Sequence, residues 1–383
     1  MSIERISASD TLAQLERFSD IIDARSEGEY ALDHLPGALN WPSLHDDERQ
    51  LVGTEYKQIS AFDAKKRGAA LIARNIATHL ERDVLAKPRD WQPLIYCWRG
   101  GKRSGALALI LEQIGFRVTL VDGGYKAFRA ALVADMPLLA ARFDFRVICG
   151  TTGSGKTRLL QALAAEGAQT LDLEALAQHR SSVLGLLPGV AQPTQKTFDT
   201  RLWAALRGLD VLRPVYIESE SKKVGNVAIP EGLIAAMRAS PCVQLELAED
   251  ERVQLLLEDY DFFVQDVAFF CERLAALTQA CGSQLVQRWQ QRARTGNIYD
   301  VVRELLVKHY DPVYLQSMRR NFAHYPAAAL AAPADRSVQA MRAMAREIVR
   351  GQAASAGERV GAAPPREATA LAAASSAGLL APG

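Results

Sequence analysis

A glycine-rich segment in the middle of the chain is the strongest local constraint on the fold. It consists of Gly150, Thr151, Thr152, Gly153, Ser154, Gly155, Lys156 and Thr157. An apolar run, 145–149, precedes it, and a stretch of helical periodicity follows it to about Glu166. In a phosphate-binding loop (P-loop) of this spacing, the glycines let the backbone wrap a diphosphate and the lysine reaches its oxygens. A strand, a P-loop and a helix in this order predict an α/β domain with a parallel sheet.

The residues around this loop leave its ligand open. The Thr157 hydroxyl can bind Mg²⁺, but no residue is fixed as a metal ligand. In an ordinary nucleotide hydrolase, a carboxylate at the end of a nearby strand holds the metal. Glu218 follows the predicted strand 215–217, and Asp172 closes the predicted strand 170–173, so either carboxylate can serve. The loop therefore suits a nucleotide or another diphosphate.

A second anion-binding loop is predicted nearer the N-terminus. It consists of Cys97, Trp98, Arg99, Gly100, Gly101, Lys102, Arg103 and Ser104. A predicted strand precedes it and a predicted helix follows it, so backbone N–H groups and the helix N-terminus can form a cradle for an anion. These dipoles and the three cations favour the thiolate of Cys97. A buried structural cysteine is the alternative, and the glycines and cations of the loop favour a nucleophile.

The elements around Cys97 predict a first parallel sheet. Strands are expected over 18–24, 94–96 and 118–121, with a helix over 104–114. The alternation of strand, loop, helix and strand is typical of parallel sheets with crossover helices.

The order of elements in 383 residues predicts two domains. We expect the first over 1–136, a connector with Pro137 over 134–142, and the second over 143–350. The second domain becomes mostly helical from about Arg252. Residues 351–383 are rich in Ala, Gly and Pro and predict a disordered tail.

Composition and charge exclude several classes of protein. Lys and Arg number 45 and Asp and Glu 44, so no global positive charge draws the chain to nucleic acid. The N-terminus lacks a signal pattern, and no apolar run approaches the roughly 20 residues of a membrane span. The 5 cysteines lack C-x-x-C spacing, which argues against a disulfide framework or a zinc knuckle. We therefore expect a cytoplasmic protein with reduced thiols and no membrane span.

Three segments of the first domain resemble rhodanese domains. Ile22–Tyr30 and His34–Asn40 look like the N-terminal signature of that family, and Tyr96–Ser104 looks like its active-site strand and loop. The resemblance implies that Cys97 carries sulfur as a persulfide or selenium as a perselenide. Arg103 stands one residue further from the cysteine than in common single-domain rhodaneses, a spacing similar to the Cys-x5-Arg loops of dual-specificity phosphatases. This departure favours a tetrahedral seleno- or thiophosphate donor over thiosulfate.

A rhodanese-like domain followed by a P-loop domain resembles the tRNA 2-selenouridine synthase family over about residues 1 to 350. The fold class implied is an N-terminal rhodanese-like parallel-sheet domain plus a C-terminal P-loop NTPase-like α/β domain with a helical C-terminal part. Segments that carry the resemblance are Leu171–Glu174 with His179 and Arg180, Gln192–Lys196, Glu218–Ser221 and His309–Pro312. From these segments, the resemblance implies a substrate site at Asp172, His179, Arg180, Gln195, Lys196, Glu218 and Ser219.

The family resemblance also implies a two-step reaction at the wobble 2-thiouridine of tRNAs of the Lys, Glu and Gln type. Sulfur is first alkylated with geranyl diphosphate, and selenophosphate then delivers selenium in place of the S-geranyl group. In this interpretation Lys156, Thr157 and the P-loop amides neutralise the leaving diphosphate. Cys97, helped by Arg99 and Arg103, takes or orients selenium. Geranyl diphosphate and selenophosphate are co-substrates, no cofactor is tightly bound, Mg²⁺ is a candidate ion, and a selenophosphate-producing enzyme is an expected partner.

Three rival functions remain open at the level of sequence. They are a persulfide transferase coupled to a true ATPase or kinase, a nucleotide-gated regulatory protein, and a phosphatase that uses the Cys-x5-Arg loop. Cys97 argues against the regulatory protein, because non-catalytic relatives of rhodaneses often lose this thiol. The loop that follows has no evident general-acid aspartate, which argues against the phosphatase. A basic and aromatic stretch, Arg288–Arg294, is compatible with RNA contact, as are Lys308–Pro312 and Arg319–Arg320. Periodicity favours an amphipathic helix whose arginines face water.

Overall fold

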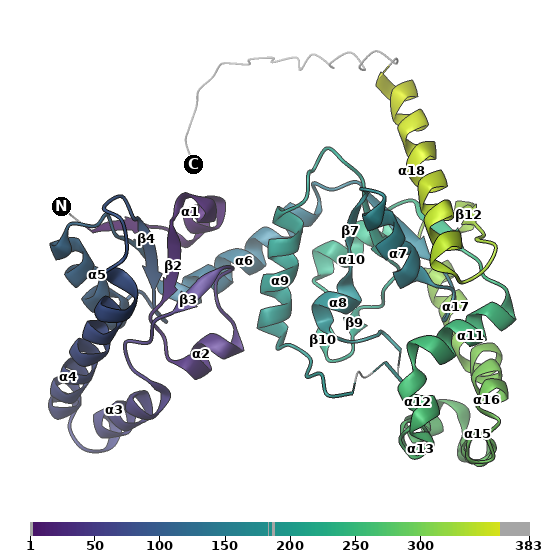
Figure 1. Cartoon of the computed structure of the whole chain (residues 1–383), viewed down its shortest axis with the longest axis horizontal. Coiled ribbons are helices and arrows are strands. Elements are labelled where there is room, and N and C mark those ends of the chain that lie inside the picture. Colours follow the sequence, from purple (N-terminus) through teal and green to yellow (C-terminus); the bar gives the residue numbers. More distant parts are fainter. Residues whose placement is uncertain (1–2, 183, 186–187, 361–383) are drawn as a thin grey trace, which may run out of the picture.

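The computed structural model describes residues 3–360, except 183, 186 and 187. Two parallel sheets form separate lobes, with α6 and α9 between them (Figure 1). The first sheet has the order β1-β5-β4-β2-β3, and every pair in it is parallel. Its strands are β1 (Glu4–Ile6), β2 (Asp20–Asp23), β3 (Ala38–Asn40), β4 (Pro93–Tyr96) and β5 (Thr119–Val121).

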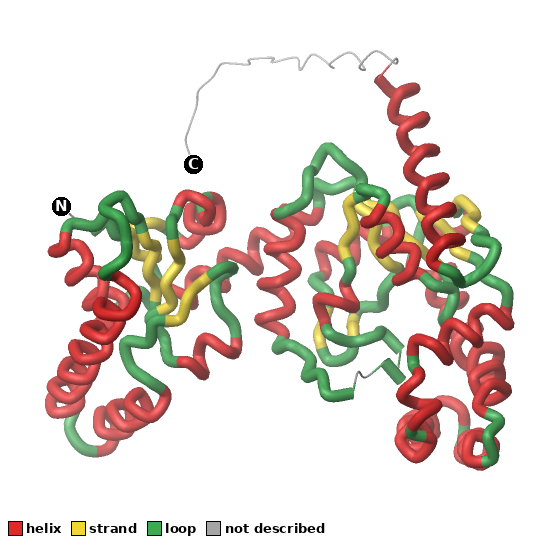
Figure 2. Tube along the Cα trace, viewed as in Figure 1, coloured by secondary structure: helices red, strands yellow, loops and turns green. Residues whose placement is uncertain are grey.

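Helices cover the first sheet and connect its strands (Figure 2). The predicted helix at 104–114 is confirmed and begins slightly earlier, at Lys102. Gly115, in the left-handed conformation with φ of 112°, ends this helix. The helical segments are α1 (Ala8–Ala13), η1 (Leu15–Arg17), α2 (Glu27–Leu32), α3 (Asp46–Gln58), α4 (Ala61–His79), η2 (Leu80–Val84), α5 (Lys102–Ile114) and α6 (Gly124–Ala140).

The second sheet has the order β12-β11-β6-β8-β7 and is also parallel throughout. The strand that ends at the P-loop is its central strand, just as the strand that ends at Cys97 is central in the first sheet. Parallel α/β sheets bind ligands at the carboxyl ends of their strands. The strands are β6 (Phe145–Cys149), β7 (Gln169–Leu171), β8 (Val215–Glu218), β11 (Cys242–Leu245) and β12 (Ala329–Ala331), with a separate antiparallel hairpin of β9 (Lys223–Val224) and β10 (Val227–Ala228).

Helices of the second lobe fall into those that flank the sheet and those of a separate helical part. The mostly helical character predicted from Arg252 onward is confirmed, with β12 as an added edge strand. The flanking helices are α7 (Lys156–Ala165), α8 (Leu173–Ala177), α9 (Gln195–Arg207) and α10 (Glu231–Arg238). The later segments are α11 (Glu249–Asp259), α12 (Asp261–Gln265), α13 (Val267–Leu274), η3 (Ala275–Leu277), α14 (Thr278–Cys281), α15 (Ser283–Arg294), α16 (Ile298–Leu305), η4 (Leu306–Tyr310), α17 (Asp311–Asn321), η5 (Tyr325–Ala327) and α18 (Val338–Val360).

Most of the expected connector at 134–142 is helical, because α6 continues to Ala140 with Pro137 inside it. Leu132, Met136 and Leu139 follow helical spacing and are buried. Their burial keeps the segment helical despite the proline. A Cβ on Gly232 of α10 would lie 2.6 Å from the Pro137 Cβ, so this glycine lets α10 pack closely on α6.

One apolar core continues from the first lobe into the second through α6 and α9. Phe128 of α6 and Trp203 of α9 lie edge to face with ring centroids 6.4 Å apart. The Trp203 indole donates to Asp135 at 2.8 Å. Thr200 of α9 donates to the buried carboxylate of Asp33 at 3.1 Å. These contacts fix α9 of the P-loop lobe directly against the first lobe.

The C-terminal helix α18 packs against α7, which follows the P-loop. It continues to Val360, past the expected start of the tail at residue 351, and disorder of the tail stays a prediction. The remainder of the predicted tail, 361–383, lies outside the described residues. Among the described residues, no helix is long and apolar enough to cross a membrane.

Candidate active site

Cys97 sits at the start of a tightly curled loop that its own backbone closes. The Gly101 N–H donates to the Cys97 sulfur at 3.2 Å, and so does the Ser104 hydroxyl. The sulfur is buried, with 3% of the residue exposed. A Cβ on Gly124, which has φ of 58°, would lie 2.2 Å from the Cys97 carbonyl oxygen. Only glycine at this position lets the start of α6 press against the loop.

The loop favours the thiolate of Cys97. Burial of the thiol opposes ionisation, but hydrogen bonds from Ser104 and Gly101 and the positive charge of Arg103 lower the pKa of Cys97 below its usual value. Arg103 is also held by Glu29, with 2.6 Å between Nη1 and Oε2. Arg99 and Lys102 are exposed at the mouth of the loop.

Residues of the rhodanese-like signature form a buried polar network at the end of β4, directly before this loop. The Arg25 guanidinium and the Asp23 carboxylate form a buried ion pair at 2.5 Å. The Tyr96 hydroxyl donates to Asp23 at 2.8 Å and accepts the Leu35 N–H at 3.1 Å. Because Tyr96 precedes Cys97 directly, this network fixes the end of β4 from which the loop departs.

The P-loop closes around its own lysine. The Lys156 ammonium donates to the Gly150 carbonyl at 2.8 Å. The Tyr314 hydroxyl of α17 accepts the Gly150 N–H at 2.6 Å and lies 2.9 Å from the Ser219 hydroxyl. Gly155 has φ of 88°, and a Cβ there would lie 2.6 Å from Met341 of α18. The loop is therefore packed between β8, α17 and α18.

Arg252 of α11 clamps the P-loop from the helical part. Its guanidinium donates to the Thr152 carbonyl at 3.0 and 2.8 Å. The same group forms a two-pronged ion pair with Asp311 at 3.0 and 2.6 Å. The aspartate of the His309–Pro312 segment thus acts on the P-loop through Arg252.

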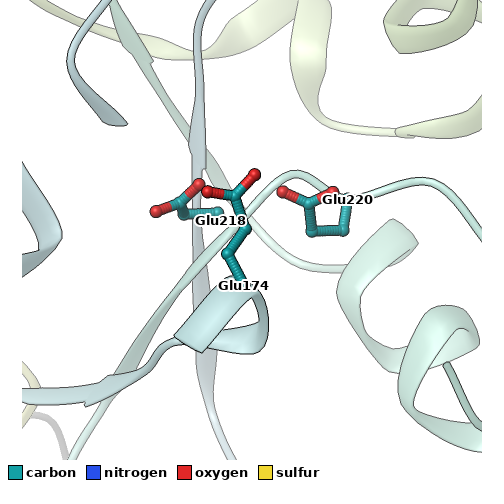
Figure 3. A group of neighbouring side chains, drawn as sticks. All are labelled: Glu174, Glu218 and Glu220. Atoms are coloured by element: carbon teal, nitrogen blue, oxygen red, sulfur yellow. The ribbon is translucent and has the colours of Figure 1, made fainter. Parts of the chain in front are cut away.

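Three carboxylates gather beside the P-loop. Ligand oxygens of Glu174, Glu218 and Glu220 all lie within 4.8 Å of one another (Figure 3). Burial and then the Glu174 charge raise the pKa of Glu220 to about 8, and burial raises the pKa of Glu218 well above its usual value. One oxygen of Glu218 is buried and has no hydrogen-bond partner among the described residues. These hard oxygen donors fit a divalent cation such as Mg²⁺.

The P-loop and the three carboxylates line a common cavity of about 460 Å³, hereafter the P-loop cavity. The predicted site residues Arg180, Glu218 and Ser219 line it, together with Lys156 and Thr157. The guanidinium of Arg180 lies 4.4 Å from the centroid of the Tyr260 ring. The cavity therefore combines a cationic diphosphate cradle with an acidic wall.

The other predicted site residues lie outside the lining of this cavity. Asp172 caps α8, where it accepts the Ala175 N–H at 2.8 Å. His179 is buried, and burial lowers its pKa. The Gln195 side-chain amide binds the backbone of Ala228. It donates to the Ala228 carbonyl at 2.8 Å and accepts the Ala228 N–H at 2.7 Å.

Lys196 lies near the first active loop. Its ammonium is 5.9 Å from the centroid of the Trp98 ring, which is itself tilted against Tyr125 at 5.5 Å. A residue of the P-loop lobe thus reaches the residue that follows Cys97. This contact joins the start of α9 to the Cys97 loop.

The sequence did not single out Arg252 or Tyr314, and it gave Glu174 and Glu220 no role of their own. Arg252 and Tyr314 stand in helical segments far along the chain from the P-loop, so spacing carries no sign of their contact with it. Glu220 lies within Glu218–Ser221, a segment that enters the sequence analysis only through the family resemblance. The alternation of acidic residues at 218 and 220 after a strand is the one signal that was present.

The basic and aromatic stretch forms α15, and its interpretation as an amphipathic helix is confirmed. Trp289 is buried and donates to Glu304 at 2.9 Å. Arg288 and Arg292 also pair with Glu304, at 3.4 and 2.8 Å. The Trp289 ring packs into the core of the helical part, so it offers no exposed face for base stacking in this stretch of the described residues.

A low-pKa thiol in an anion loop and a P-loop with a carboxylate cluster, each at the carboxyl end of a central strand, define a two-domain enzyme that combines a rhodanese-like domain with a P-loop domain. Family models agree with this division. The rhodanese-like domain model matches residues 7–131, and the model for the tRNA 2-selenouridine synthase AAA domain matches residues 143–271.

Curated relatives extend the match over most of the chain. A tRNA 2-selenouridine synthase of Alcanivorax borkumensis is 34% identical over 299 residues, which cover 76% of this chain and 80% of the relative. One of Marinobacter nauticus is 31% identical over 326 residues, covering 77% and 87%. One of Nitrosomonas europaea is 35% identical over 244 residues, covering 63% of each. The chain belongs to the tRNA 2-selenouridine synthase family, whose members are enzymes of tRNA modification.

Proposed function

We propose that this enzyme converts wobble 2-thiouridine of tRNA to 2-selenouridine in two steps. The tRNA sulfur first attacks the C1 carbon of geranyl diphosphate, and the C–O bond breaks as diphosphate leaves with the electron pair. Selenium of selenophosphate then attacks the uridine carbon, the C–S bond breaks and geranyl thiol leaves. Water cleaves the P–Se bond and releases phosphate. The observation that carries the proposal is the presence of two distinct anion cradles in one chain.

The P-loop supports the first step. Lys156 lines the P-loop cavity beside Thr157 and the loop amides, so its charge can meet the diphosphate. In the present structure its ammonium is held only by the Gly150 carbonyl among the hydrogen bonds of the described residues, and this contact can be exchanged for phosphate oxygens. Stabilising the leaving group is the same electrostatic task that a P-loop performs in phosphoryl transfer.

The Cys97 loop supports the second step. Its amides, with Arg99 and Lys102 exposed at the mouth, suit an anionic tetrahedral donor. Transfer of selenium from selenophosphate to Cys97 as a perselenide would leave phosphorus reduced, because sulfur and selenium each lose an electron. An orienting role for Cys97 needs no further reactant, and we favour it.

Mg²⁺ has a place in this proposal through the carboxylate cluster. Glu174, Glu218 and Glu220 would hold the ion in the cavity that Thr157 also lines. When bound, the ion would add positive charge at the diphosphate. Without the ion, burial and the neighbouring carboxylates raise the pKa of Glu220 to about 8 and raise the pKa of Glu218, which limits the negative charge of the cluster.

Nucleoside mass spectrometry tests the proposal. Thiolated tRNA, geranyl diphosphate and selenophosphate are supplied together and then omitted one at a time. We expect Cys97→Ala to abolish selenation and to leave geranylation intact, because the two loops serve different steps. Lys156→Ala should lower geranylation by roughly 100-fold, the usual cost of a removed electrostatic donor. Lys57→Ala, an exposed lysine of α3, is the control.

Two results would contradict this division. Equal loss of both products in Cys97→Ala would remove the separate role of the thiol. A tRNA-stimulated ATP hydrolysis that replaces the need for geranyl diphosphate would favour a sulfurtransferase coupled to an ATPase.

A further inference from the structure

A second, smaller cavity opens from the side of the P-loop cavity and enters the helical part. It has a volume of about 60 Å³ and is hereafter the apolar pocket. The two cavities share Thr152, Ser182, Leu256, Tyr260 and Tyr310 in their linings, so these residues form the mouth between them. A ligand whose phosphates lie on the P-loop can therefore extend through this mouth.

Beyond the mouth, the lining contributed by described residues is entirely apolar. Its side chains come from α11, α12, α13, α16, η4 and the segment that contains Leu184. Phe263 and Phe270 form part of the wall and are nearly fully buried. A purine or pyrimidine base would lose its hydrogen bonds to water here and gain none in return. The pocket suits a hydrocarbon tail.

We propose that the apolar pocket holds the distal end of the prenyl chain while the P-loop holds the diphosphate. This inference rests on the proposed geranylation and assigns the part of the site that selects the chain. A cavity of about 10–15 Å³ accommodates one water molecule, so 60 Å³ has room for roughly four to six groups of that size. One isoprene unit has five carbons, so the distal unit fits the pocket and the proximal unit lies at the mouth.

The pocket also has a defined end wall. Leu257, Val264 and Ile298 line both the apolar pocket and a groove of about 450 Å³ on the outer side of the helical part. These three side chains therefore separate the two spaces. A farnesyl chain carries one more isoprene unit and would meet this wall. The wall sets the upper limit of chain length, and Leu257 is the side chain whose shortening connects the pocket to the groove.

Two substitutions test the assignment in opposite directions. Val302→Phe adds a ring to the partly buried pocket wall on α16, and Leu257→Ala removes the end wall. Val307→Phe introduces the same ring at a residue that is 50% exposed and is not among the residues that line the pocket, so it is the matched control. Transfer to thiolated tRNA is measured with geranyl and with farnesyl diphosphate, and inhibition by inorganic diphosphate is measured in parallel.

We expect Val302→Phe to raise KM for geranyl diphosphate by about tenfold, the usual penalty of filling a packed apolar site. The inhibition constant of inorganic diphosphate should not change, because this anion binds only the P-loop. An unchanged inhibition constant also shows that the P-loop remains folded. Leu257→Ala should raise kcat/KM for farnesyl relative to geranyl diphosphate by about tenfold, the gain from one better-buried group of this size. Val307→Phe should match the unchanged enzyme.

The outcomes separate the two proposals. If the unchanged enzyme transfers neither chain, geranylation itself is wrong and the prenyl assignment falls with it. If it transfers geranyl but both pocket variants behave like Val307→Phe, geranylation stands and the pocket assignment is overturned. Weaker ATP binding in Val302→Phe, with an unchanged KM for geranyl diphosphate, would assign the pocket to a base and would also overturn the inference.

Discussion

Removal of the Asp311 carboxylate should destabilise the P-loop lobe, because it leaves the buried guanidinium of Arg252 without its ion-pair partner. The Arg252 residue is 8% exposed and is neutralised by two contacts with Asp311, at 3.0 and 2.6 Å. Removing one partner of a buried pair leaves the other charge unpaired and costs roughly 3–5 kcal/mol. Because the Asp311 side chain keeps 21% of its exposure, we expect Asp311→Ala to lower the free energy of unfolding by about 2–3 kcal/mol.

Urea unfolding followed by circular dichroism measures this change, with the slope compared between variants. Asp63→Ala breaks an ion pair with Lys66 whose side chains are both largely exposed, and it should lower the free energy of unfolding far less than Asp311→Ala does. A cycle of Asp311→Ala, Arg252→Met and the double variant should give a coupling of at least about 1 kcal/mol. A loss no larger than in Asp63→Ala, or no coupling, would refute the clamp. Geranylation should fall in parallel, since Arg252 also holds Thr152.

Two further predictions concern ionisation. Burial and the Glu174 charge raise the pKa of Glu220 to about 8 from 4.5, so the folded state holds a proton that the unfolded state releases, and stability should fall as pH rises through this window. In urea unfolding at several pH values, Glu220→Gln should reduce the loss of unfolding free energy with rising pH. Glu231→Gln, at the exposed start of α10, should leave that loss unchanged. An unchanged pH dependence in Glu220→Gln would contradict the assignment to Glu220. Ser104→Ala removes a hydrogen bond to the Cys97 sulfur and should raise the pKa of that thiol, measured as thiolate absorbance against the same protein with Cys97→Ala. An unshifted titration would mean that the loop amides alone favour the thiolate.

Local sequence patterns located both anion loops because the chemistry of each lies in consecutive residues. Cys97 to Ser104 and Gly150 to Thr157 each follow an apolar strand and precede a helix, and the structure has these elements in place. Gly153 and Gly155 of the P-loop adopt positive φ, as the wrapped backbone requires. A strand, a loop and a helix that follow one another depend on residues close together in the sequence, so motif spacing was sufficient to locate both loops.

Composition alone does not place the ends of α6 and α18. Pro137 lies inside α6, where the buried side chains around it keep the segment helical. The helix α18 extends to Val360, into the Ala-rich segment for which disorder is predicted.

The sequence by itself determined which residues form the two cradles, since a P-loop and a cysteine loop are each encoded by adjacent positions. Only the tertiary structure decided what surrounds them. Arg252 and Tyr314 reach the P-loop from distant helices, and Lys196 reaches Trp98 across the two lobes. The apolar pocket likewise has no sequence signature, because its walls come from several helices whose apolar residues also serve the core. Contacts between distant segments depend on how helices pack, and packing is settled by the whole chain.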